Sequence, residues 1–313
     1  MYFLTVFIQI IIMFILIAIG FSLSKLKVWS EGTIKELTTF LLNIVSPALM
    51  IKAFVKPVTG EHLKNFGMVA LATTIIYILS ILMAKLLFAL PKFKNSYDVP
   101  SYKFAATYSN CVFMGIPMIQ AMLGMDGLFY AIPFITVNSV FLWSHGLEIF
   151  RSQKSSFKET TKHILLNPNI IAILLGFIMF TTDTVKYIPN VIMEPIDYLS
   201  MLNTPLSMIV IGANFVIITE PIYKDKMSWF MTLIRNVVYP LIFIPILYFF
   251  PLHSDAKIAL MILSAAPIAG LIVMFNIINN RSTDFATRTL CLSTLSSVIT
   301  MPLILMFCKF LFR

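Results

Sequence analysis

Charged residues are scarce in this chain, and their scarcity excludes a soluble protein. Asp, Glu, Lys and Arg together make up 12% of the 313 residues, whereas 59% are hydrophobic, and the mean hydropathy is +0.91. A soluble domain of this size has too little polar surface to cover so many apolar side chains. The composition therefore predicts an integral membrane protein.

Cysteine and histidine are also rare, with three and four copies respectively. Cys111, Cys291 and Cys308 all fall within apolar stretches, which excludes a disulfide framework and a zinc cluster. No cluster of His, Asp or Cys stands at the ends of these stretches, as a membrane-embedded enzyme acting on lipid would need. We therefore expect no enzyme, no catalytic residues, no metal site and no cofactor.

Acidic residues are missing from the interior of every long apolar stretch. All 14 fall in loops or near the ends of the stretches, and Asp126 and Glu148 come closest to the membrane. A carboxylate-driven proton or sodium exchanger normally needs a buried Asp or Glu to bind and release the cation. That class of transporter is therefore not expected.

What the chain does contain is a series of apolar runs, most of them near the roughly 20 residues that a helix needs to span hydrocarbon. Lipid satisfies no open N–H or C=O group, so these runs must be helical. The sequence predicts an all-α polytopic membrane protein. Its ten expected transmembrane helices are 2–24, 37–51, 65–84, 104–125, 127–147, 164–182, 198–219, 227–252, 258–280 and 289–308.

The longest basic and polar stretch, 151–163, divides these helices into five and five. An odd number in each half makes the second half insert upside down relative to the first. Three residue pairs repeat at offsets of 156, 158 and 150, as a duplication would leave them: Gly20 with Gly176, Pro47 with Pro205, and Pro117 with Pro267. We therefore expect two inverted five-helix repeats, 1–150 and 164–313, joined by a cytoplasmic loop at 151–163.

The net charge of +9 indicates an orientation in the membrane rather than a nucleic-acid partner. Assigned to alternate loops, the 23 Lys and Arg divide 16 to 7, and basic loops stay in the cytoplasm. Both termini are therefore predicted outside the cytoplasmic membrane. The first apolar run is not expected to be a cleaved signal peptide, because it is too long and Lys25 and Lys27 follow it.

Proline and glycine stand at matching positions in the fourth and ninth expected helices. Pro117 removes a backbone donor, Gly115 cannot hold the helix by side-chain packing, and Pro267 and Gly270 repeat the arrangement. Breaks at mid-membrane survive where they line a cavity or pack in protein. The free N–H groups of each half-helix would suit an anion such as a carboxylate. Simple kinks in packed helices are the alternative interpretation.

Asparagines and hydroxyl groups supply the polar lining of the expected substrate site. Asn110 is the strongest candidate, because it lies seven residues before Pro117 and so on the same helix face. Asn43 and Asn203 precede the prolines of another matched pair, and they are candidates for the cavity wall or an ion site. The secondary candidates are Ser109, Ser264 and Asn276. Interhelical hydrogen bonding is the alternative role for these side chains.

Arg235 is the most notable charge, because it lies eight residues inside the expected helix 227–252. It is a further secondary candidate, able to attract an anion from the cytoplasmic side. The interpretation we favour is an interfacial arginine whose side chain snorkels to the membrane surface.

Several short motifs follow one another along the whole chain. Residues 110–117 read Asn-x-x-Phe-Met-Gly-Ile-Pro and residues 167–171 read Asn-Pro-Asn-Ile-Ile, with further motifs at 204–214, 266–269 and 293–297. Together they resemble the auxin efflux carrier (AEC) family, whose bacterial members are often called malate permeases. The short 151–163 stretch favours the compact prokaryotic branch of that family.

The resemblance implies an architecture and a motion. The fourth and ninth helices would be crossover helices that intersect at their prolines, with Asn110, Pro117 and Pro267 as functional positions. A core bearing the crossover would move like an elevator against a scaffold of the first, second, sixth and seventh helices. Those scaffold helices would also form the interface of a homodimer. Family members carry small organic anions, including auxin and dicarboxylates.

Residues and resemblance together predict a secondary transporter. We expect it to move a small organic anion, such as a mono- or dicarboxylate, across the cytoplasmic membrane by alternating access. Its expected partners are that anion, the lipid bilayer and a second copy of the chain. A sodium-coupled symporter of the bile-acid type and a non-transporting membrane receptor are the alternatives.

Overall fold

The computed structural model describes residues 2–55, 60–94, 96–151, 161–162, 164–217 and 225–312, and these residues form helices without a strand. The all-α prediction is confirmed for this part of the chain. Most of the predicted loop at 151–163 lies outside the described residues.

The helices of the N-terminal half follow one another with few long connections. They are α1 (Tyr2–Lys25), α2 (Glu31–Phe40), η1 (Leu41–Val45), α3 (Ser46–Ala53), α4 (Gly60–Leu87), α5 (Pro91–Lys94), α6 (Val99–Thr107), η2 (Cys111–Gly115), α7 (Ile116–Phe141) and η3 (Leu142–Gly146).

The described helices of the C-terminal half are divided in a similar way. They are α9 (Pro168–Thr181), η4 (Thr184–Tyr187), α10 (Asn190–Met201), α11 (Asn203–Asn214), η5 (Phe215–Ile217), α12 (Lys226–Leu233), η7 (Ile234–Val238), α13 (Tyr239–Phe249), α14 (Ser254–Ala265), α15 (Leu271–Ile278) and α16 (Asp284–Leu311).

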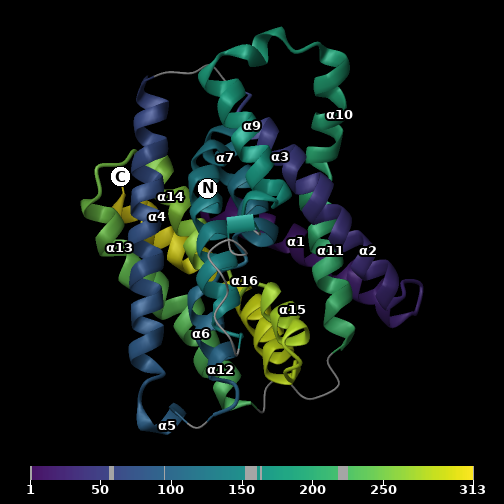
Figure 1. Cartoon of the computed structure of the whole chain (residues 1–313), viewed down its shortest axis with the longest axis vertical. Helices are drawn as coiled ribbons and strands as arrows, with labels where there is room; N and C mark the ends of the chain where they lie inside the picture. The colour runs from purple at the N-terminus through teal and green to yellow at the C-terminus, as the bar shows by residue number, and fades with distance from the viewer. Residues whose placement is uncertain are drawn as a thin grey trace.

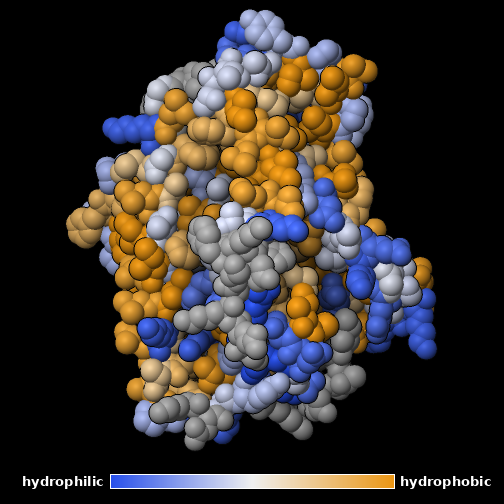
Figure 2. All heavy atoms as spheres, viewed as in Figure 1, coloured by the Kyte–Doolittle hydropathy of each residue, from blue (hydrophilic) through white to orange (hydrophobic). Residues whose placement is uncertain are grey.

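Seven helical stretches of the described chain are long and apolar enough to cross a membrane. They are Phe7–Lys25, Glu31–Ala53, Leu63–Leu87, Cys111–Gly146, Asn190–Asn214, Lys226–Phe249 and Asp284–Leu311, and Pro168–Thr181 is a shorter apolar helix. Figure 2 shows hydrophobic side chains over much of the visible face, whereas hydrophilic ones gather over the outer end of α2. These helices indicate a multi-pass membrane protein.

Short polar side chains determine where several helices begin. Ser30 caps α2 by accepting a hydrogen bond from the Thr33 backbone N–H at 3.1 Å. Asn167 caps α9 by accepting from the Asn169 N–H at 2.9 Å, and Pro168 follows at the first helical position. Proline is favourable there, because a helix leaves that N–H unpaired in any case.

The long helix α7 consists of two helices joined at Gly124. This residue has φ 62° and ψ −150°, a backbone conformation that a residue with a Cβ atom adopts only under strain. The sequence predicted two separate membrane helices here, ending at 125 and starting at 127. The kink at Gly124 divides α7 at that boundary.

Three prolines follow π-helical turns that keep their helices continuous. η1, η2 and η7 end two residues before Pro47, Pro117 and Pro240 respectively. In each turn an N–H bonds to the carbonyl five residues back, for example from Ile116 to Cys111. A proline cannot donate to the carbonyl four residues back, and this wider pattern accommodates the missing donor.

Two glycines allow α1 and α11 to pack in very close contact. A Cβ atom added to Gly20 would lie 1.8 Å from the Ile209 carbonyl oxygen, and one added to Gly212 would lie 1.8 Å from the Ile17 carbonyl oxygen. Small residues at such contacts bring membrane helices together. The α10–α11 pair therefore holds α1, and it also contacts α2 and α3.

The remaining helices form a second packed group around α7. α4 and α14 both pack against α7, while α16 packs against α12 and α14. In Figure 1, α4 runs along one flank and α10 and α11 along the other, with α7 and α16 between them. The interruptions described below lie inside this second group.

Candidate functional site

The backbone opens between α6 and η2. α6 ends at Thr107, Tyr108 is extended with φ −102° and ψ 122°, and Asn110 has φ −79° and ψ 54°, outside the helical range. Residues 108–110 therefore separate two helical segments, and all three are buried.

A second opening separates α14 from α15. α14 ends at Ala265, Ala266 has φ −59° and ψ 146°, and α15 starts at Leu271. Pro267 lies inside this opening, as the sequence predicted. The Ile268 N–H donates to the Ser293 hydroxyl oxygen of α16 at 3.2 Å, so the opened backbone finds a partner on a neighbouring helix.

The two openings are paired with each other. The Asn110 N–H donates to the Pro267 carbonyl oxygen at 2.7 Å, and the Ala269 N–H donates to the Tyr108 carbonyl oxygen at 3.1 Å. Ser109 and Ile268 thereby form an isolated antiparallel bridge in an otherwise helical molecule. The ends of four helical segments, α6, η2, α14 and α15, meet at this bridge.

The opening in the first segment lies upstream of its predicted position. We expected the break at Gly115 and Pro117, but both are buried in continuous helix, because the π-helical turn η2 accommodates the proline. Pro117 cannot donate to the Phe113 carbonyl, and the Ser207 hydroxyl of α11 lies 3.4 Å from that oxygen. Pro117 thus frees a carbonyl toward α11 without opening the helix.

Asn110 and two serines are the predicted side chains that the bridge brings together. Asn110 is 6% exposed, and it pairs with Pro267 through its backbone N–H, so the bridge does not use its side-chain amide. The hydroxyl groups of Ser109 and Ser264 are buried, and neither has a hydrogen-bond partner among the described residues. Buried polar groups normally find partners, so this centre offers unsatisfied donors and acceptors to a ligand.

Arg235 is buried beside the second opening, which corrects the prediction of an interfacial, snorkelling side chain. It is 2% exposed, on the π-helical turn η7. Its terminal NH2 group donates to the Ser264 carbonyl oxygen at 2.6 Å. That carbonyl is free because α14 stops at the next residue, so the break in α14 creates the acceptor that holds the guanidinium group inside.

The remaining predicted positions on these two segments have identifiable structural roles. A Cβ atom on Gly115 would lie 2.8 Å from the Leu263 side chain, so this glycine lets η2 approach α14. Gly270 is the N-cap residue of α15, and a Cβ atom there would lie 4.0 Å from the Leu290 side chain. The Asn276 amide accepts from the Ser101 hydroxyl at 3.1 Å and donates to the Ile272 carbonyl at 2.8 Å. Asn276 therefore ties α15 to α6.

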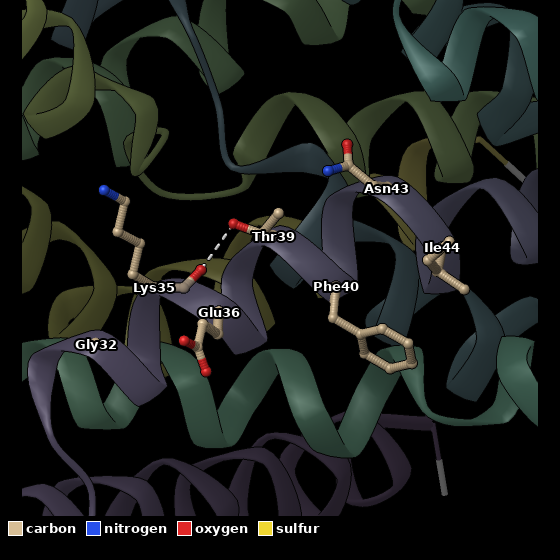
Figure 3. Close-up of a pocket in the computed structure, with 7 residues that line it drawn as sticks. All are labelled: Gly32, Lys35, Glu36, Thr39, Phe40, Asn43 and Ile44. Carbon is tan, nitrogen blue, oxygen red and sulfur yellow. Dashed lines mark hydrogen bonds between the residues drawn. The ribbon is translucent and has the colours of Figure 1, made fainter.

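The two asparagines of the other matched pair lie in different surroundings. Asn203 is fully buried at the start of α11, and both polar atoms of its amide lack partners among the described residues. Asn43 is exposed on η1, where it points to the same side as Lys35 and Thr39 (Figure 3). The structure does not bring Asn43 together with Asn110.

Sequence reasoning missed the residues that hold the bridge in place. The Tyr108 hydroxyl lies 2.9 Å from both the Phe141 carbonyl oxygen and His145 Nδ1. Asn236 donates to the Ser293 carbonyl oxygen at 2.7 Å, beside the Ser293 hydroxyl that receives the Ile268 N–H. No local pattern marks these contacts, since each joins segments far apart in the sequence.

The assembled groups can bind and orient a ligand. They are the Asn110 amide, the hydroxyls of Ser109 and Ser264 and a guanidinium, and Arg235 is the one charged side chain among the buried residues that the structure describes. Within the described residues, no group of three or more His, Cys, Asp or Glu could hold a metal ion.

The fold and the site thus define a helical membrane protein with a buried polar centre. A model of the family described as "Membrane transport protein" matches residues 5–305, nearly the whole chain. The chain belongs to this family, and the similarity to auxin efflux carriers inferred from its motifs is confirmed. The protein is a membrane transporter, and its relatives are transporters rather than enzymes.

Two archaeal relatives support the assignment. An uncharacterized transporter of Methanothermobacter thermautotrophicus is 23% identical over 293 residues, which cover 92% of this chain and 94% of the relative. An uncharacterized transporter of Methanocaldococcus jannaschii is 26% identical over 215 residues, which cover 66% of this chain and 67% of the relative.

Proposed function

We propose that this transporter moves a small organic anion across the cytoplasmic membrane by alternating access around the bridge between residues 108–110 and 267–269. The observation that carries the proposal is the pairing of two interrupted helical segments next to a buried arginine. Discontinuous helices that meet at mid-membrane form the substrate sites of many secondary transporters. A mono- or dicarboxylate fits donors of this kind.

The proposed architecture has ten membrane helices in two inverted repeats. Seven long stretches and Pro168–Thr181 are described as apolar helices. Dividing Cys111–Gly146 at Gly124 adds one helix, and α14 with α15 completes the ten as an interrupted helix. In this arrangement α6–η2–α7 up to Gly124 is the fourth helix and α14–α15 is the ninth. These two are the proposed crossover helices.

Each group at the bridge has a proposed role. The Asn110 amide donates to the carboxylate of the substrate, supported by its burial at the bridge. The N-termini of η2 and α15 add partial positive charge. Pro267 keeps the second opening unwound, Gly115 lets the two segments approach, and Pro117 directs a carbonyl toward α11.

Alternating access would occur between two packed groups. α1, α2–α3, α9 and α10–α11 form the proposed scaffold, and the helices around α7 form the proposed moving core. Between them, the Ser207 hydroxyl lies 3.4 Å from the Phe113 carbonyl, and Thr204 donates to Gln120 at 3.2 Å. Exchangeable hydroxyl contacts of this kind suit a surface along which one group slides past the other. The buried Asn203 directly precedes Thr204 at the start of α11.

The orientation and assembly in the membrane are also proposals. The excess of Lys and Arg in alternate loops supports an orientation with both termini outside the cytoplasmic membrane. On α2 and η1, an exposed polar stripe consists of Lys35, Thr39 and Asn43 (Figure 3). A second copy of the scaffold covering this stripe would remove it from lipid. A Thr39→Cys variant that forms an interchain disulfide in membranes supports such a homodimer, and failure to cross-link counts against it.

Transport by purified protein in lipid vesicles tests the function. Radiolabelled acetate, lactate, succinate and malate are loaded, and efflux is measured with and without a membrane potential. Asn110→Ala should lower the rate about 10- to 100-fold, the value of a hydrogen bond to a charged group. Asn214→Ala is the matched control, because that amide only caps the Val210 carbonyl of its own helix.

The same vesicles separate the alternative functions. A strict requirement for sodium identifies the sodium-coupled symporter. Binding of these anions, seen as a raised melting temperature, without any flux identifies a receptor. Equal transport by the Asn110→Ala variant and the wild type would remove the bridge from the mechanism.

A further inference from the structure

Arg235 is a buried charge without a carboxylate partner. Tyr77, Tyr239 and Cys111 lie near its guanidinium, and none of them carries a carboxylate. No ion pair joins Arg235 to an acidic residue in the described part of the chain. Its terminal NH2 donates to Ser264, while its Nε has no partner among the described residues.

Such a charge is unfavourable unless something compensates it. An arginine side chain does not lose its proton in proteins, and unpaired ions inside membranes are rare and mark functional sites. The C-terminus of α14 compensates in part, because it carries about half a negative charge. A helix dipole has no net charge, however, so the group of helices containing Arg235 keeps one full positive charge in its apolar interior.

Hydrogen bonds link Arg235 and its neighbour to the bridge rather than to the scaffold. Its neighbour Asn236 donates to the Ser293 carbonyl at 2.7 Å, and the Ser293 hydroxyl accepts from Ile268 inside the second opening at 3.2 Å. Arg235 itself holds Ser264, two residues before that opening starts. The charge and the bridge are therefore parts of one rigid cluster and move together.

We propose that Arg235 is the fixed counter-charge of the substrate, so that the core crosses the membrane neutral when loaded and with one positive charge when empty. The inference rests on the proposed function. It identifies the preferred substrate as an anion with a single negative charge. A dianion would leave the loaded core with a net negative charge, and its passage would depend on the membrane potential.

This charge assignment predicts which step responds to voltage. Exchange of labelled for unlabelled substrate uses only the loaded core, so a potential of about 100 mV should change its rate less than two-fold. Net efflux also needs return of the empty, charged core, and it should respond strongly. One unit charge moved through 100 mV corresponds to about 2.3 kcal/mol, or a bias of about 50-fold.

The experiment compares succinate with its monomethyl ester in the same vesicles. The two probes share a carbon skeleton and differ in charge by one unit. We expect the ester to exchange at least about 10-fold faster at pH 7.5, without response to the potential. Succinate exchange should rise as the pH is lowered and the singly charged form accumulates. Faster exchange of the dianion, or ester exchange that follows the potential, overturns the inference.

Two variants test Arg235 itself. Arg235→Lys keeps the charge and should keep exchange independent of voltage, whereas Arg235→Gln should make exchange of the ester change several-fold with the potential. Arg288→Gln is the matched control, because this arginine lies beside Asp225 at 3.7 Å and is partly exposed. If Arg235→Gln does not fold, the comparison of succinate with its monomethyl ester in the wild type still tests the charge assignment. Absence of any anion flux in the wild type contradicts the proposed function instead.

Discussion

Replacing Gly20 by alanine places a methyl group against the backbone of a neighbouring helix. The new Cβ atom would lie 1.8 Å from the Ile209 carbonyl oxygen, whereas a carbon–oxygen contact needs about 3.3 Å. Carbonyl groups of a helix cannot rotate away, so α1 and α11 would have to separate by about 1.5 Å. The same argument holds for Gly212, whose Cβ atom would meet the Ile17 carbonyl at 1.8 Å.

The expected loss of stability follows from two opposing effects. Overpacking of a tight contact costs about 3 kcal/mol, while alanine is favoured over glycine within a helix by about 1 kcal/mol. The net loss is about 2 kcal/mol. At about 2–4 °C per kcal/mol, we expect the melting temperature of the protein in detergent to fall by about 4–8 °C for Gly20→Ala.

The assay is thermal unfolding of the purified protein, followed by size-exclusion chromatography of heated samples. Gly67→Ala in α4 is the matched control, because a Cβ atom there meets nothing within 4 Å, and it should leave the melting temperature unchanged or slightly raised. The double variant Gly20→Ala/Gly212→Ala should lose less than the sum of the single variants, since the first substitution already separates the helices. Equal melting temperatures for Gly20→Ala and Gly67→Ala would refute the close packing of α1 and α11.

Three further predictions concern the polar contacts. Ser101→Ala and Asn276→Ala, measured singly and together, should show a coupling of about 0.6 kcal/mol in the free energy of unfolding, which is typical of interhelical hydrogen bonds. Additive effects of the two substitutions would contradict a hydrogen bond between these side chains. Tyr108→Phe should lower the melting temperature by about 2–4 °C, because the partly buried Phe141 carbonyl and His145 imidazole lose a partner worth about 1 kcal/mol; an unchanged value would contradict the assigned contacts. Burial raises the pKa of Asp98, although Arg281 beside it acts in the opposite direction. The pKa of the Asp98 carboxyl is higher in the folded than in the unfolded protein, so stability present at low pH is lost as the pH rises through the folded-state pKa. Asp98→Asn should therefore raise the melting temperature by about 1 °C at pH 7 but not at pH 4.

The sequence predicted the helices and one of the two openings with local arguments. Hydrophobic runs and the scarcity of charge indicate membrane helices, and Pro267 marks the second opening because proline lacks a donor. The same argument wrongly predicted the first opening at Pro117, because the π-helical turn η2 accommodates the missing backbone N–H donor. The first opening lies at 108–110, where its backbone pairs with residues 157 and 161 positions away, and no local pattern encodes that partner.

Residues at matched positions in the sequence also differ in burial. Asn43 and Asn203 both precede a proline in related segments, yet Asn43 is exposed on η1 and Asn203 is fully buried in α11. Arg235 stands in an apolar run that equally permits a surface or an interior position. The free Ser264 carbonyl, which exists because α14 ends there, favours the interior.

The amino-acid sequence by itself determined that this chain is a helical membrane protein of a transporter family, because hydropathy, proline chemistry and motif order are properties of neighbouring residues. Only the tertiary structure decided which polar groups remain unsatisfied together at the bridge and that Arg235 is buried among them. Burial and pairing depend on what the other helices place around a residue, and this information is distributed over the whole chain.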